Sequence, residues 1–141
     1  MIDVFCPCVP PKTTAQQKRA NFKTGVFFKD KKGAQAISTL EGVLMPHQPE
    51  KPVSGLVRLS VEVVWPWRNS DINTKAKKAH AEKVGRIPCG SKPDLDNWVK
   101  NLQDVLVSLR FIERDEFVCD LSVRKFFGEE PGIRVTVQEV D

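Results

Sequence analysis

The sequence predicts a small single domain of the α/β (α+β) class, in which a mixed sheet of about five strands packs with two main helices. Three observations support this. The chain has 141 residues, the length of one domain. Residues 57–65 alternate apolar and mostly polar side chains, as in a strand with one buried face. Residues 96–109 place apolar side chains on one helical arc.

The N-terminal half contains two predicted strands and one predicted helix. Residues 2–8 favour a strand, which the following prolines end. Residues 12–24 are basic and have no clear period, so we expect a surface loop. Residues 26–29 favour a short strand, and residues 33–45 carry apolar side chains at helical spacing before Pro46.

The C-terminal half contains the clearest elements. The strand over residues 57–65 ends at Pro66. Residues 67–93 hold few apolar side chains, so we expect a basic, mobile excursion with a short helix around residues 74–84. The helix over residues 96–109 has the strongest apolar stripe in the chain. Residues 118–127 and 133–140 favour strands, and the turn residues between them predict a hairpin.

Composition argues against several functional classes. No apolar run approaches the roughly 20 residues that span a bilayer. The N-terminus lacks the basic start and apolar core of a secretory signal, so we expect a cytoplasmic protein. His47 and His80 have no partner nearby in the sequence, which gives little support for histidine-based catalysis. The cysteines do not match the usual zinc spacings and are expected to pack as reduced thiols; they are Cys6, Cys8, Cys89 and Cys119.

The net charge of +4 conceals a segregation of charge along the chain. Residues 10–32 carry seven Lys or Arg against one acid, and residues 65–93 carry seven against two. Residues 94–141 reverse the balance, with eleven acids against six bases. This pattern favours a polyanionic partner and a positive species among the acids, most simply a metal ion. The alternative is that solvated surface charges happen to segregate.

Two groups of charged residues carry the candidate chemistry. Asp94 and Asp96 enter the predicted helix and can direct both carboxylates to one spot, a ligand pair that suits Mg²⁺. A bound divalent ion would offset their repulsion, generate hydroxide from water and neutralise charge on a reacting phosphate. Lys100, one turn later, could hold that phosphate. Asp115 reaches the pair only if the chain after the helix folds back beside the helix start.

Each of these residues also has an ordinary structural interpretation. An Asp-x-Asp pair at a helix start is commonly a cap that also suits the helix dipole. Lys100 is spaced to form an ion pair with Asp96 or Asp104 on the helix surface. Asp115 and its neighbouring glutamate could be loop acids without a further role.

The region around these acids resembles the RusA family of Holliday junction resolvases, which are crossover junction endodeoxyribonucleases. The family signature is K-P-D-x-D-N-x-x-K-x-x-x-D, followed after a spacer by a further aspartate. The same spacing is found here in Lys92-Pro-Asp-Leu-Asp-Asn-Trp-Val-Lys-Asn-Leu-Gln-Asp and then Arg114-Asp115-Glu116. The similarity covers residues 92–140, and the N-terminal half matches loosely through an early strand, a Pro-Pro turn and a basic loop before a helix. This motif is far more specific than Asp-x-Asp alone.

The resemblance implies a homodimeric endonuclease that depends on Mg²⁺, with Mn²⁺ as a possible substitute, and cuts four-way DNA junctions with paired nicks. The setting it implies is recombination and repair in bacteria or phages. Asp94, Asp96 and Asp115 would be the metal-binding carboxylates, and Lys100 would be the catalytic lysine. Asp104 also fits the pattern and is expected either to support the metal-binding residues from behind or to be structural.

Two positions depart from the family pattern. Arg114 stands where the family often has a second acid, and Glu116 is the nearby acid that could compensate. Phe117 stands where the family often has a glutamine.

The basic segments are expected to contact DNA phosphates, which positions DNA without reading its sequence and weakens with salt. The expected contacts are Lys12, Lys18, Arg19, Lys23, Lys75, Lys77, Lys78, Arg86 and Lys92. We expect branched DNA as the partner, and neither a membrane nor a nucleotide cofactor. Two alternatives remain: a non-catalytic DNA-binding module whose Asp94 and Asp96 only cap a helix, and a nuclease that prefers flaps or forks.

Overall fold

The computed structural model describes residues 1–12, 18–21, 26–29 and 31–140, with side chains for residues 1–12 and 34–140. The elements in chain order are β1 (Ile2–Pro7), β2 (Lys18–Asn21), β3 (Val26–Lys29), α1 (Lys31–Leu44), η1 (Met45–His47), β4 (Val57–Pro66), α2 (Asn69–Ile72), α3 (Lys75–Val84), β5 (Arg86–Pro88), α4 (Leu95–Ser108), η2 (Asp115–Phe117), β6 (Val118–Gly128) and β7 (Gly132–Glu139).

Five of the strands form one mixed sheet in the order β1-β7-β4-β6-β5. The central strand β4 runs parallel to β6 and antiparallel to β7. β1 is antiparallel to β7, and β5 is antiparallel to the end of β6. The predicted mixed sheet is therefore confirmed. β2 and β3 form a separate antiparallel pair, so the loop expected over residues 12–24 is wrong for Lys18–Asn21, while residues 13–17 and 22–25 lie outside the described residues.

The predicted hairpin between residues 118–127 and 133–140 is wrong, although both segments are strands. β4 lies between β6 and β7: Val61 is paired with Val123 on one side and with Val135 on the other. The odd-numbered residues of β4 are almost fully buried, as expected of a strand at the centre of a sheet. Alternation in the sequence identifies the buried face of a strand but not which strands lie beside it.

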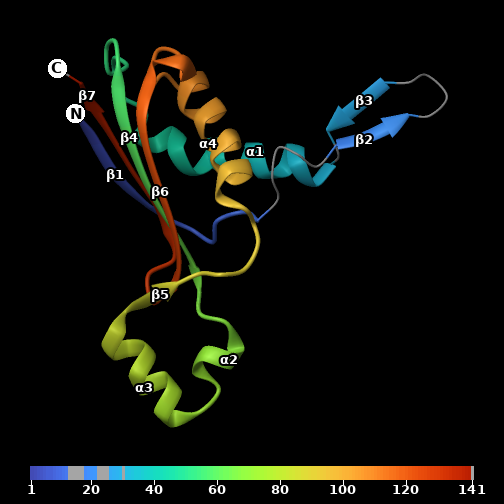
Figure 1. Ribbon diagram of the computed structural model, residues 1–141, viewed down its shortest axis with the longest axis vertical. Helices are drawn as coiled ribbons and strands as arrows, with labels where there is room; N and C mark the ends of the chain where they lie inside the picture. The colour runs from blue at the N-terminus through green and yellow to red at the C-terminus, as the bar shows by residue number, and fades with distance from the viewer. Residues whose placement is uncertain (13–17, 22–25, 30, 141) are drawn as a thin grey trace.

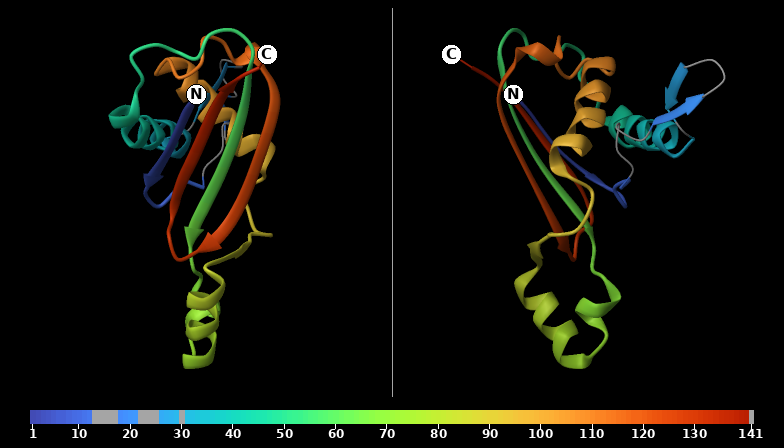
Figure 2. Two further views of the ribbon diagram at one scale, coloured as in Figure 1. Left: turned by 90° about the vertical axis from the view of Figure 1, so that its left-hand side faces the viewer. Right: turned by 45° about the vertical axis from the view of Figure 1, so that its right-hand side comes forward.

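The helices α1 and α4 cover one face of the sheet and leave the other face open (Figures 1 and 2). Both were predicted from their apolar spacing, and both are confirmed within two residues at each end. The face of α4 toward the sheet carries the side chains that build the core over β4. These are Trp98, Val99, Leu102, Val105 and Leu106.

Residues 67–93 contain more regular structure than the sequence indicates. The predicted short helix is present as α3, whereas α2 and β5 were not predicted. α2 and α3 pack mainly on each other and extend beyond one end of the sheet (Figure 1). In the part of the chain that the structure describes, no helix has the length and apolar character needed to cross a membrane.

Candidate active site

The first turn of α4 presents the predicted acidic pair. Asp94 is the residue that precedes the helix, with an extended backbone, and its carbonyl accepts a hydrogen bond from the amide of Trp98 at 3.0 Å. Its carboxylate makes no capping hydrogen bond. Asp94, Asp96 and Lys100 are all exposed. The start of α4 thus presents two carboxylates and one ammonium group to solvent.

Two tryptophans anchor this end of α4 to the sheet and to the N-terminal segment. Trp98 is 1% exposed, and its indole N–H donates to the carbonyl of Pro11 at 2.8 Å. Trp65, on β4, donates in the same way to Pro10 at 2.8 Å. The two rings meet edge to face, with centroids 6.1 Å apart. Because buried indole N–H groups need a partner, these two hydrogen bonds hold Pro10 and Pro11 beside the two tryptophans.

Lys125 fixes the loop that enters the site. Its ammonium group donates to the carbonyl of Pro93 at 2.9 Å and also to that of Ser91. The Lys92–Pro93 peptide bond is cis. Sequence reasoning missed Lys125, but a signal was present: Lys125 occupies the position between Val123 and Phe127, on the face of β6 that the alternation marks as apolar.

The ordinary structural roles of the three charged residues at the helix start are not adopted. Within residues 34–140 and 1–12, no hydrogen bond or ion pair involves the side chain of Asp94, Asp96 or Lys100. Mg²⁺ is commonly held by one or two carboxylates, with water and substrate phosphate as its other ligands. Two exposed aspartates flanking one helix start are a donor set that fits this mode of binding.

Asp115 lies at the other end of α4 from this pair. α4 has 14 residues and is therefore about 21 Å long. β6 gives a second estimate: Lys125 contacts Pro93, and the seven residue-to-residue steps from Val118 to Lys125 span about 23 Å. Asp115 precedes Val118 and is thus about 20 Å from Asp94 by either measure.

The chain does not fold back to bring Asp115 beside Asp94 and Asp96. Among the described residues, no three His, Cys, Asp or Glu side chains lie close enough together to hold a metal ion. Asp115 itself is exposed on η2. Its neighbour Glu116, the acid that could compensate for Arg114, instead forms an ion pair with Arg114 at 2.7 Å.

The predicted DNA-binding residues are distributed over separate parts of the molecule. Lys92 immediately precedes the site, and Lys12 follows the Pro10–Pro11 turn. Three further lysines lie together at the start of α3: Lys75, Lys77 and Lys78. Arg86 is engaged within the protein, by Glu62 and by the ring of Phe126 at 4.0 Å. The side chains of Lys18, Arg19 and Lys23 lie outside the described part.

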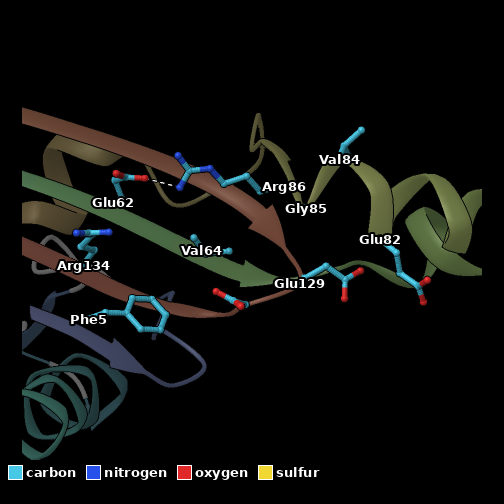
Figure 3. Close-up of a pocket in the computed structure, with 10 residues that line it drawn as sticks. Phe5, Glu62, Val64, Glu82, Val84, Gly85, Arg86, Glu129 and Arg134 are labelled. Atoms are coloured by element: carbon cyan, nitrogen blue, oxygen red, sulfur yellow. Dashed lines mark hydrogen bonds and ion pairs between the residues drawn. The ribbon is translucent and has the colours of Figure 1, made fainter.

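A pocket of about 760 Å³ lies away from these acids, on the open face of the sheet (Figure 3). It is bordered by β4, β7 and the segment that joins α3 to β5. Four of its lining residues are acidic: Glu62, Glu82, Glu129 and Glu130. Of the predicted site residues only Arg86 lines it, so this pocket is not the predicted active site.

Comparison with known proteins agrees with the motif at the start of α4. The family model described as endodeoxyribonuclease RusA matches residues 8–138. An uncharacterized protein of Bacillus subtilis (strain 168), YqaN, is 42% identical over 98 residues, which are 70% of this chain and 68% of that protein. A crossover junction endodeoxyribonuclease, rusA, of Lactococcus phage r1t is 28% identical over 140 residues, 91% of this chain and 90% of that protein. The family match covers nearly the whole chain, including its helices and its strands. This protein therefore belongs to the RusA family of endodeoxyribonucleases.

Proposed function

We propose that the protein is a Mg²⁺-dependent, structure-selective endonuclease that resolves Holliday junctions by paired phosphodiester hydrolysis. The observation that carries this proposal is the start of α4, where Asp94, Asp96 and Lys100 are exposed and have no structural partner among the described residues. Family membership and the likeness to a phage crossover junction endonuclease support it. A helix cap alone would use the Asp94 carboxylate, and here it does not.

Each charged group at the helix start has a proposed role. Asp94 and Asp96 hold the metal ion, and Lys100 holds the scissile phosphate and balances the charge that develops on it. Magnesium, when bound, supplies a more acidic water and neutralises phosphate charge. The anchored helix start keeps these groups at constant spacing, because Trp98 and Lys125 secure its two flanks. Hydrolysis at this site would leave a 5′-phosphate and a 3′-hydroxyl.

The third acid is proposed to come from a second copy of the chain. Two ligands of one Mg²⁺ lie within about 4 Å of each other, because each metal–oxygen distance is about 2.1 Å. Asp115 is about 20 Å from Asp94 within the chain, five times too far. A two-fold axis across the middle of α4 would bring Asp115 of one protomer toward Asp94 and Asp96 of its partner, twice over. A homodimer would therefore complete two equivalent sites.

The test is cleavage of a labelled synthetic four-way junction with Mg²⁺, Mn²⁺ or EDTA. We expect symmetric nicks with Mg²⁺ and none with EDTA. Asn in place of Asp94, Asp96 or Asp115 should abolish cleavage while binding is kept, because the change removes a ligand charge and leaves the fold. Lys100→Ala should cut poorly and have an unchanged circular dichroism spectrum.

Glu50→Gln is the control, because it removes the same charge from an exposed position that lies outside α4 and outside the family signature. It should cut like the wild type. Binding without nicking in Mg²⁺ would overturn the proposal in favour of a non-catalytic DNA-binding module. Faster cleavage of flaps or forks than of junctions would overturn the substrate assignment and leave the nuclease chemistry intact.

A further inference from the structure

Residues 67–88 form a helical lobe that the proposed active site does not use. The lobe consists of α2, α3 and β5 with their connections, and it projects from the end of the sheet where β4 ends and β5 pairs with β6 (Figures 1 and 2). Within its two helices only Ala81 is buried. The two helices therefore contribute little to the hydrophobic core, and any function of the lobe is expected to lie on its exposed surface.

Several contacts hold the base of the lobe in one orientation. The indole N–H of Trp67 donates to the Glu129 carboxylate at 2.7 Å, and the Glu129 amide donates to the Gly85 carbonyl at 2.9 Å. The guanidinium of Arg68 lies 4.4 Å from the centroid of the Phe127 ring. Arg86 lies over Phe126 and pairs with Glu62. These contacts brace the base of the lobe against β4, against the end of β6 and against Glu129, which follows β6.

The bracing also divides the basic residues of the lobe into two groups. Arg68 is bonded to Asp71 at 3.0 Å, a pair that lowers the pKa of the Asp71 carboxyl chiefly through its hydrogen bond to Arg68. Arg86 is likewise satisfied by Glu62. Lys77 is also engaged: its ammonium group donates to the Ser70 carbonyl at 3.2 Å, and its charge helps to lower the pKa of the Asp71 carboxyl. In the described structure, by contrast, Lys75 and Lys78 have no acidic partner. These two lysines thus remain available in the first turn of α3, and Lys83 in its last turn is a further exposed lysine that forms no ion pair within the described residues.

This placement of lysines is electrostatically unfavourable for the protein alone. The start of a helix carries a partial positive charge, and acidic residues are usual there. The first turn of α3 has no acid and holds Lys75, Lys77 and Lys78. A local arrangement that works against helix stability is typical of a surface kept for a partner, and a polyanion would relieve the repulsion.

The surroundings restrict the side from which a polyanion can approach. The acidic pocket lies between the base of the lobe and the open face of the sheet, and Figure 3 shows Glu62, Glu82 and Glu129 around it. Arg86 and Arg134 also line the pocket, but its four acids leave a net negative charge, which disfavours phosphate there. α4 starts at the same end of the sheet as the lobe, since only residues 89–94 separate β5 from α4, but it packs on the other face of the sheet. DNA at Asp94 and Asp96 would thus extend past the lobe without crossing the acidic pocket.

We propose that the helical lobe binds the sugar–phosphate backbone of the duplex arm that carries the scissile phosphate, through Lys75 and Lys78. This inference rests on the proposed function and adds the partner of a separate surface. Lys75 and Lys78 are three residues apart and share one face of α3, where they can contact two neighbouring phosphates, and α3, about 15 Å long, spans four or five base pairs of one arm. The contact adds affinity for the arm without reading its bases.

The experiment compares the variant K75A/K78A with the control K51A/R124A. Both lose two exposed positive charges that form no ion pair within the described residues, but the control residues lie outside the lobe. Binding to a four-way junction is measured in EDTA by fluorescence anisotropy over a range of salt concentrations. Since each phosphate contact contributes about 0.9 to the slope of log K against log salt, the lobe variant should lose about 2 of that slope and the control less than 1. Alanine favours helices, so α3 should persist, which circular dichroism checks.

A second measurement locates the contact on the DNA. A run of neutral methylphosphonate linkages is placed at successive positions along one arm. At one position along the arm, the neutral linkages should weaken binding of the wild type but leave binding of the lobe variant unchanged. The neutral linkages and the lysine substitutions remove the two sides of the same contact, so their effects should not add. K75Q/K78Q, a milder change, serves if the alanine variant unfolds.

The outcomes separate this inference from the proposed function. Equal losses in the lobe variant and the control, or no position on the arm that couples to the lobe, would overturn the lobe inference even if the wild type cuts junctions. Wild-type protein that binds junctions with the expected lobe contribution but does not cut them in Mg²⁺ would overturn the proposed function and support the lobe inference. A wild type that binds no DNA would overturn both.

Discussion

Mixing two inactive variants should restore cleavage if the active site is shared between subunits. The variants are Asp96→Asn, which damages the pair at the start of α4, and Asp115→Asn, which damages the acid at its far end. In a mixed dimer, one site combines both substitutions and the other combines the unchanged Asp96 of one protomer with the unchanged Asp115 of the other. One of the two sites is then intact.

The expected magnitude follows from the geometry. Because about 20 Å separates Asp94 from Asp115 within a chain and ligands of one ion lie within about 4 Å, a site in a single chain would not contain both. Random reassociation makes about half of the dimers mixed, each with one working site of two, so about a quarter of wild-type sites are recovered. A site confined to one chain would recover none, because every chain in the mixture carries a lesion.

The assay uses a supercoiled plasmid with an extruded cruciform, after the two proteins are unfolded and refolded together. Wild-type protein should linearise the plasmid by paired nicks, whereas the mixed dimer should yield mainly nicked circles. The control mixes Asp94→Asn with Asp96→Asn, where both lesions fall in the same half of the site, and should stay inactive. If the Asp96→Asn and Asp115→Asn mixture is as inactive as this control, the shared site is refuted.

Two further predictions concern the fold. Gly132→Ala should lower the free energy of unfolding, measured by heat or urea, by about 1–3 kcal/mol, because a Cβ there would lie 2.6 Å from both the Cys6 carbonyl and the Phe5 ring. Gly42→Ala is the control and should not destabilise the protein, because a Cβ at that position would meet open space. Equal stability of the two variants would contradict the packing of β1 against β7. Burial and, secondarily, Cys8 raise the pKa of Cys6 from 9.0 to about 11, so its contribution to stability is complete below about pH 9 and is lost as pH rises toward 11. Iodoacetamide at pH 8 should therefore modify exposed Cys119 before Cys6, as peptide mass spectrometry would measure, and equal rates would refute the assigned burial.

Local patterns predicted the elements that depend on local physics. α4 follows from apolar residues repeated at the helical period, and the buried face of β4 follows from alternation, because both reflect which side chains one element turns toward the core. The same holds for α3, found where a short helix was expected. The candidate residues Asp94, Asp96 and Lys100 share one helix start, so their proximity also followed from sequence.

Features that depend on contacts between distant segments were not predictable in this way. Nothing in residues 118–140 indicates that β4 lies between β6 and β7, because each strand would present the same alternation beside any neighbour. β5 has three residues, too few for a pattern, and exists through its pairing with the end of β6. Lys125 breaks an apolar alternation for a reason visible only when Pro93 is beside it.

The amino-acid sequence by itself determined the family, the class of fold and the charged groups that the chemistry requires, because each resides in a short stretch of chain whose spacing carries the information. The tertiary structure decided where those groups stand relative to one another. The length of α4, together with the course of β6 parallel to β4, places Asp115 about 20 Å from Asp94 and Asp96. Contacts such as the hydrogen bond from Trp67 to Glu129 brace the base of the lobe, so that a basic stretch of sequence becomes a projection from the sheet. Distances between segments are set by how the segments pack together, and the sequence of a single segment carries no information on that packing.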